Sequence, residues 1–182
     1  MRLLALLVVF AAGGCVCARV PQICTGDTCS CSKESICTCP SGSCAVDCAG
    51  NCVQTCSGGS ACTLDVGNAS NVTCQDTATC SGQAGTELLL SCTDSANCSL
   101  TTLRGAQATC GGSSTCALTV DATSSVTCNG SSTCDVTCTS GTCTLTCADS
   151  AKCTCAGGTC NVTCGTATRN CPNGKIACNV NC

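Results

Sequence analysis

The fold is decided by one stretch, CGGSSTCALTVDATSSVT (residues 110–127), and by its repetition on either side. Between residues 56 and 134, cysteines recur in two series, each with a step of 18 residues. The two series are Cys56, Cys74, Cys92, Cys110 and Cys128, and Cys62, Cys80, Cys98, Cys116 and Cys134. A fixed period indicates a repeat architecture, and this one is too short for helical hairpins but suits one coil of a β-solenoid.

Side chains alternate within the unit. In residues 115–120, Cys116, Leu118 and Val120 share one face of a strand, and the residues between them share the other. A shorter run follows at residues 126–128, and Gly, Ser, Asp and Thr between the runs supply turns. We therefore expect an all-β, single-domain β-solenoid (β-helix) of roughly nine short, disulfide-rich coils, in which stacking buries the apolar face. Between residues 138 and 155, the spacing of the cysteines does not show which segments form the longer half of a coil and which form the shorter half.

The chain begins with an export signal. Arg2 precedes an apolar run over residues 3–12, which is of signal-peptide length and too short to span a membrane. Cleavage after Ala18 would give a signal peptide of residues 1–18 and a solenoid of residues 19–182. The alternative is a lipoprotein signal of residues 1–14 with Cys15 lipidated, and such an anchor is the only expected membrane contact. Either route predicts a protein secreted or anchored at the cell surface.

Thirty cysteines in 182 residues indicate a disulfide scaffold in an oxidising compartment. The chain has no Trp, Tyr or His, and its single Met and single Phe lie in the export signal. Cross-links must therefore substitute for large apolar side chains. The expected pairs lie within a coil, such as Cys110 with Cys116. Pairing between coils, such as Cys110 with Cys128, stays open because both separations permit a bridge.

The motifs for chemistry are sparse. No His is available for acid–base catalysis, the Asp residues are spread through turns, and no nucleophile–base set is visible, so we expect no enzyme, no cofactor and no metal site. A net charge of −3 and the lack of aromatic residues disfavour nucleic-acid binding. C-x-C pairs keep a thiol-based metal binder as a minor alternative. N-x-S/T sequons, relevant only if the host glycosylates exported proteins, begin at Asn68, Asn71, Asn97, Asn129 and Asn161.

Outward threonines form the candidate ice-binding row. If the phase holds, stacking aligns one row of Thr101, Thr119, Thr137, Thr146 and Thr163, and a second of Thr115, Thr133, Thr142 and Thr159. Repeats rich in cysteine and threonine, in a disulfide-laced solenoid, resemble insect hyperactive antifreeze proteins. The resemblance implies ice binding on a flat threonine face. The period of 18 differs from the 12 of that family, and Thr is also a good former of exposed strands.

The function we expect is that of an exported structural or surface-interaction protein, a rigid rod without a catalytic site. Association with a cell surface or cell wall fits this interpretation, although the sequence names no partner. Ice binding is the alternative, and thiol-based metal binding is a further one. One irregularity, Leu88-Leu89-Leu90, interrupts the alternation as a bulge, a local contact or a spot for a partner.

Overall fold

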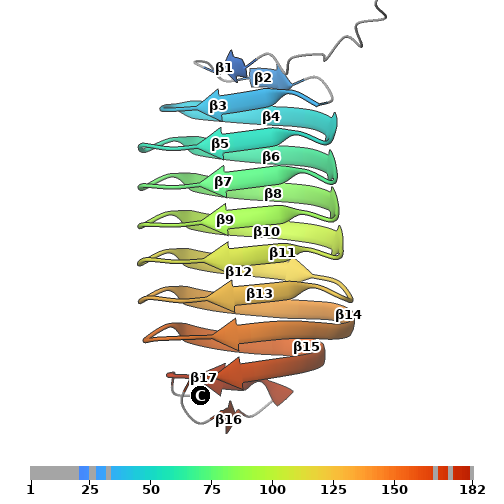
Figure 1. The fold of residues 1–182 in the computed structure, drawn as a ribbon, viewed down its shortest axis with the longest axis vertical. Helices are drawn as coiled ribbons and strands as arrows, with labels where there is room; N and C mark the ends of the chain where they lie inside the picture. Colours follow the sequence, from blue (N-terminus) through green and yellow to red (C-terminus); the bar gives the residue numbers. More distant parts are fainter. Residues whose placement is uncertain (1–20, 25–27, 32–33, 166–167, 172–173, 181–182) are drawn as a thin grey trace, which may run out of the picture.

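The structure, a computed structural model, describes residues 21–24, 28–31, 34–165, 168–171 and 174–180. These residues form a β-solenoid without a helix (Figure 1). The strands are β1 (Pro21–Ile23), β2 (Thr28–Cys31), β3 (Ile36–Cys39), β4 (Ser43–Gly50), β5 (Val53–Cys56), β6 (Ala61–Asn68), β7 (Asn71–Cys74), β8 (Thr79–Thr86), β9 (Leu89–Cys92), β10 (Asn97–Arg104), β11 (Gln107–Cys110), β12 (Thr115–Val120), β13 (Ser125–Cys128), β14 (Thr133–Cys147), β15 (Lys152–Cys164), β16 (Arg169–Asn170) and β17 (Ile176–Cys178). The predicted fold class is confirmed.

Each coil contributes one strand to each of two faces. The short face consists of the odd-numbered strands from β1 to β13, and the long face consists of the even-numbered strands from β2 to β12. On both faces a strand pairs in parallel with the strand one coil further along, as β5 does with β7 and β6 with β8. The coils stack along the rod in Figure 1, with β1 and β2 at one end and β16 and β17 at the other.

The solenoid has about eight turns, slightly fewer than the roughly nine expected. The reason lies at the C-terminal end. There, β17 turns back and pairs antiparallel with the first half of β15, so the last cysteine-rich segment closes the stack instead of adding a coil. Among the described residues, no helix is long and apolar enough to cross a membrane.

The spacing of the cysteines did not show which segments of residues 138–155 lie on which face. The structure answers this through β14 and β15, which each run through both faces. The first half of β14 continues the long face, since Thr133 pairs with Thr115. Its second half continues the short face, since Thr144 pairs with Ser125. The segment 138–147 therefore turns from one face to the other, although its spacing resembles that of a long strand.

Inward side chains form one continuous core. Leu64, Leu100 and Leu118 from the long face and Val72 and Val126 from the short face are buried, as the alternation predicted. Leu89 lies in regular register and exposes 45% of its surface, so the strand has no bulge there.

The cysteines stack at the first corner of the coil, where a short strand turns into a long one. The rungs are Cys39–Cys44, Cys56–Cys62, Cys74–Cys80, Cys92–Cys98, Cys110–Cys116, Cys128–Cys134, Cys147–Cys153 and Cys164–Cys178. We call this stack the disulfide ladder. Every cysteine of one rung is the register partner of a cysteine in the next, for example Cys110 with Cys128 and Cys116 with Cys134. The pairing in this stack is thus within the coil or, at the last rung, across the terminal turn.

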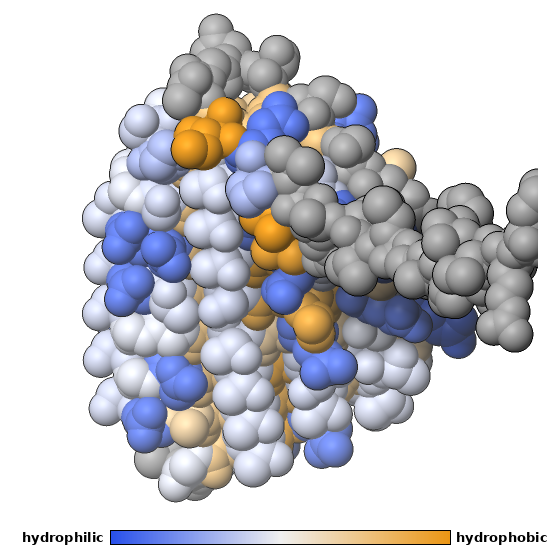
Figure 2. Space-filling view, turned by 45° about the horizontal axis from the view of Figure 1, so that its top comes forward, coloured by the Kyte–Doolittle hydropathy of each residue, from blue (hydrophilic) through white to orange (hydrophobic). Residues whose placement is uncertain are grey.

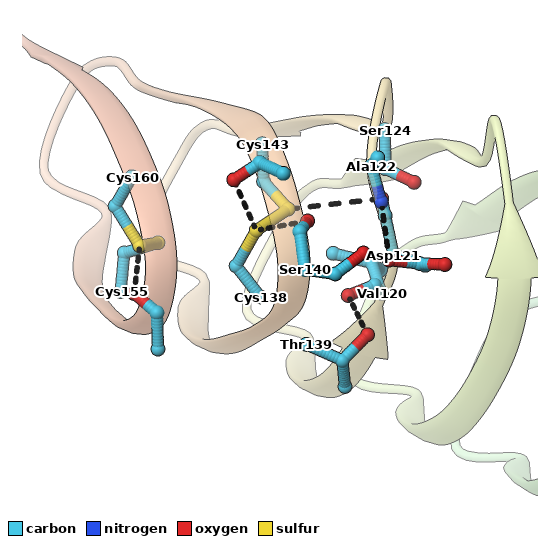
Figure 3. The surroundings of a disulfide bond; sticks show 12 residues. Val120, Asp121, Ala122, Ser124, Cys138, Thr139, Ser140, Cys143, Cys155 and Cys160 are labelled. Carbon is cyan, nitrogen blue, oxygen red and sulfur yellow. Dashed lines mark hydrogen bonds between the residues drawn. A yellow bond between two sulfur atoms is a disulfide. The ribbon is translucent and has the colours of Figure 1, made fainter.

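The second corner, where a long strand turns into a short one, is cross-linked only towards the ends of the rod. Its disulfides are Cys31–Cys37, Cys48–Cys52, Cys138–Cys143 and Cys155–Cys160, and Figure 3 shows the last two. In the middle coils the row of Cys48 and Cys138 is occupied by Val66, Ala84, Thr102 and Val120 instead. The end coils of a stack have one neighbour rather than two and fray first, and here they carry the additional bridges.

Candidate binding face

One column of hydroxyl side chains runs along the short face through eight coils. Its members occupy the outward position directly before a ladder cysteine: Thr38, Thr55, Thr73, Ser91, Thr109, Thr127, Thr146 and Thr163. We call it the threonine column. Because neighbouring parallel strands lie about 4.8 Å apart, the hydroxyl and methyl groups repeat at that spacing along the rod. Only Ser91 departs from threonine, and it keeps the hydroxyl.

The side chains of the threonine column are half-buried or exposed. No hydrogen bond joins their hydroxyls to another residue in the described part of the chain. Threonines at the corners behave differently, because Thr77 donates to the carbonyl of Gly58 at 2.9 Å and Thr139 to that of Val120 at 3.2 Å (Figure 3). The column hydroxyls are therefore available to water or to a surface, whereas the corner hydroxyls hold turns together.

This arrangement corrects the first row predicted from sequence. Thr101, Thr119 and Thr137 are register partners on the long face, but the next residue of that row is Ala156. Thr146 and Thr163 lie on the short face, where Thr127 is the partner of Thr146. The predicted row joined two faces because the chain crosses from one face to the other within β14.

The second predicted row is wrong for the same reason. Thr115 pairs with Thr133 on the long face, and Thr133 pairs with Lys152. Thr142 and Thr159 pair with one another beyond the second corner. No predicted row contained the short-face residues from Thr38 to Thr127. Their signal in the sequence was the Thr-Cys dipeptide, Ser-Cys at residues 91–92, that spans each unit boundary.

The long face is less uniform than the short face. Its outward row through Thr101 also contains Asp47, Asp65 and Gln83. The next outward row holds Thr63, Ser81, Ser99, Ala117, Asp135 and Thr154. A face with mixed charge, amide and methyl groups offers no repeated pattern to an ordered surface.

A second column on the short face runs beside the threonine column and mixes apolar and polar groups. It contains Ile36, Val53, Asn71, Leu89, Gln107, Ser125, Thr144 and Asn161. Ile23, which is 69% exposed, precedes Thr38 at the N-terminal end of the threonine column. In Figure 2 a pale column runs along the rod beside a column with orange and blue patches. The N-terminal part of this face is thus the more apolar.

Asp121 lies at the second corner, where hydrogen bonds hold its carboxylate. The pKa of Asp121 is lowered, most by the hydroxyl of Ser140 and further by the amide of Ala122, 2.7 Å away. Figure 3 shows this carboxylate against the segment that carries Cys138. Within the described part of the chain, the one ion pair joins Lys175 to Asp135 at 3.7 Å on the surface. Asp121 therefore serves to fix a turn.

Several groups of sulfur atoms lie close together, but these atoms belong to disulfides. The set with the most members, Cys24, Cys29, Cys31 and Cys37, holds four sulfurs within 4.8 Å of one another. These cysteines form two bridges, and every cysteine in the described part of the chain is disulfide-bonded. A metal-binding thiolate would require reduction first. Cys15 and the export signal lie outside the described residues.

The fold places the chain in the class of parallel, disulfide-rich β-solenoids with a repeat near 18 residues. No protein family, no characterised protein and no solved structure matches the chain. Its disulfide content is typical of exported proteins.

Proposed function

We propose that the protein is an exported structural rod that holds to an extracellular surface through the threonine column. The observation that carries the proposal is the combination of that column with the disulfide ladder directly behind it. Each column residue precedes a ladder cysteine, so its backbone is fixed by a covalent bridge on one side and by strand pairing above and below. A rigid array loses little conformational freedom on binding, which favours adhesion through many weak contacts.

Retention on the cell envelope tests this function. Purified, oxidised chain is labelled and sedimented with envelope fragments of the producing cells. Thr73, Thr109 and Thr127 are replaced by Lys in one variant, and Thr101, Thr119 and Thr137 by Lys in a matched variant of the long face. We expect the short-face variant to lose at least about tenfold in retention, given three disrupted contacts of order 0.5 kcal/mol or more each. Equal retention of both variants, or none by the unmodified chain, would contradict the proposal.

Ice binding is a second candidate, and the uniformity of the threonine column favours it. A flat, repeated set of hydroxyl and methyl groups can order water in a lattice-like layer, and the same face also suits a polar solid surface. The pair of lysine variants separates the faces again. Thermal hysteresis that is present in the unmodified chain, lost in the short-face variant and kept in the long-face variant would support ice binding. Its absence in the unmodified chain would exclude ice binding and leave the surface rod.

The final location rests on how the export signal is processed. A mature chain beginning at Arg19 would be secreted, and one beginning at lipidated Cys15 would be anchored. Intact-mass analysis of the exported protein distinguishes the two, because the lipidated chain carries the mass of its acyl groups. A product that keeps residues 1–14 would overturn the export proposal.

A further inference from the structure

The disulfide ladder places sulfurs of neighbouring rungs close together. In four places both sulfurs of one rung lie within 4.8 Å of a sulfur in the next: Cys56 and Cys62 near Cys80, Cys92 and Cys98 near Cys116, Cys110 and Cys116 near Cys134, and Cys128 and Cys134 near Cys153. Register partners in parallel strands have Cα atoms about 4.8 Å apart, which is within the range that a disulfide spans. A bridge between coils is therefore compatible with the same backbone as a bridge within a coil.

Only the C-terminal end of the ladder is open to solvent among the described rungs. Cys164 is partly exposed, whereas Cys178 and the sulfurs of the inner rungs are buried. A thiolate arriving from outside would therefore attack the sulfur of Cys164. Cys178, the leaving group, is the register partner of Cys153 in the next rung.

We propose that Cys164–Cys178 is a thiol-exchange site that captures a thiol-bearing partner, and that the ladder carries the displaced thiol away from it. An incoming thiolate bonds to Cys164 and breaks the bond to Cys178. The Cys178 thiolate then bonds to Cys153 and releases Cys147.

The same step can repeat along the rod. Cys147 bonds to its register partner Cys128 and releases Cys134, and Cys134 bonds to its register partner Cys116 and releases Cys110. Each step forms one disulfide, breaks one disulfide and passes on one thiolate, so no oxidant or reductant is consumed. Bridges within coils become bridges between coils.

The relay makes capture hard to reverse. A mixed disulfide is usually undone by the thiol that was displaced, which here would be Cys178. Once Cys178 is bonded to Cys153, the free thiol lies further up the ladder, out of reach of Cys164. The partner then stays covalently attached to the C-terminal end of the rod. This attachment is independent of the threonine column.

The second corner supplies a matched control. Cys160, like Cys164, is partly exposed, and attack there would release Cys155. The register partners of Cys155 are Val136 and Ile176, neither of which carries sulfur. A thiol released at Cys155 therefore has no cysteine among its register partners with which it could form a new disulfide.

Two single substitutions place a thiol at the start of each path. Cys164→Ser leaves Cys178 unpaired, and Cys160→Ser leaves Cys155 unpaired. After incubation at pH 8, acid quenching, pepsin digestion and mass spectrometry locate the bridges. We expect C164S to contain Cys153–Cys178 and Cys128–Cys147 bridges, and its free thiol, detected by alkylation, to be spread over several ladder cysteines. In C160S we expect the free thiol to be alkylated at Cys155 alone. A thiol that remains wholly on Cys178 would overturn the proposal.

The unmodified chain gives a test that does not depend on either variant folding. It is incubated with excess cysteamine at pH 7 and at pH 9, then quenched and mapped in the same way. We expect cysteamine on Cys164 together with the Cys153–Cys178 bridge, and faster formation at pH 9 because only the thiolate attacks. Cysteamine on Cys164 with Cys178 still free, or no adduct at Cys164, would contradict the proposal.

Discussion

The amide nitrogen of Gly58 donates a hydrogen bond to Oδ2 of Asp76, one coil further along the chain, at 2.9 Å. Both residues have positive φ, 59° and 60°, and occupy the same position of the first corner. The other residues at this position are Asp94, Gly112, Gly130 and Asp149, all with positive φ. Asp and Gly share the position because Gly adopts this backbone freely and Asp tolerates it while capping the coil before it.

Substitutions of Asp76 separate its two roles, which are to accept the hydrogen bond from Gly58 and to adopt a positive φ. Asp76→Ala removes the acceptor and puts a less suited residue in the left-handed region, so we expect a loss of about 1–2 kcal/mol. Asp76→Asn keeps an acceptor and a tolerant backbone and should change stability little. Hydrogen exchange at the Gly58 amide, together with the guanidinium midpoint, measures both effects. Equal exchange rates in the two variants would show that the side chain does not cap Gly58.

The inside and outside of the long face can be distinguished at adjacent residues. Leu118 is 3% exposed, and Leu118→Asp would bury an unpaired charge at a cost of at least about 3 kcal/mol. Thr119 faces outward between its register partners Thr101 and Thr137, so Thr119→Asp should stay within about 0.5 kcal/mol of the unmodified chain. Guanidinium unfolding with the disulfides intact compares the two. Similar midpoints would contradict the alternation.

Deletion of residues 110–127 should be tolerated. It removes the complete rung Cys110–Cys116 and joins Thr109 to Cys128, whose register neighbours already match. Deletion of residues 110–118 removes the same two cysteines but leaves only half a coil, so the strands that follow lose their register with the coils before them. We expect the first protein to be exported and oxidised and the second to misfold, as seen by yield and non-reducing gel mobility. Failure of both would mean that the coils are not interchangeable.

Acid should loosen the turn that Asp121 fixes. The hydroxyl of Ser140 and the amide of Ala122 lower the pKa of this carboxyl below its ordinary 3.8. A carboxyl with a lowered pKa in the folded state contributes stability above its unfolded pKa and loses it as pH falls through the folded value. We expect hydrogen exchange at residues 139–141 to rise below pH 3.8. Asp121→Asn should remove that dependence, and a persistent rise in the variant would assign it to another group.

The sequence predicted the regular region well and the last third poorly, and the reason is geometric. From residue 56 to 134 every inward position repeats at 18 residues, so alternation and period agree on which side chains are buried. Beyond it, the threonine column steps by 19 residues from Thr127 to Thr146 and by 17 from Thr146 to Thr163. Alternation looks the same on either face, and only the corner that absorbs the extra residue decides the face. The spacing of residues along the chain does not show which corner absorbs the extra residue. The sequence prediction therefore placed Thr146 in a row of the long face, although it lies on the short face.

The extra bridges at the second corner determine where the rod can change in length. The coils between Cys74 and Cys134 have one bridge each and interchangeable small residues at the second corner, whereas those towards either end carry two. A duplicated or lost unit in the middle leaves both reinforced ends in place, but a change at an end removes a bridge that no other coil supplies. Relatives of this chain should therefore differ in their number of central repeats and keep both termini, so that length varies without loss of the closing segments.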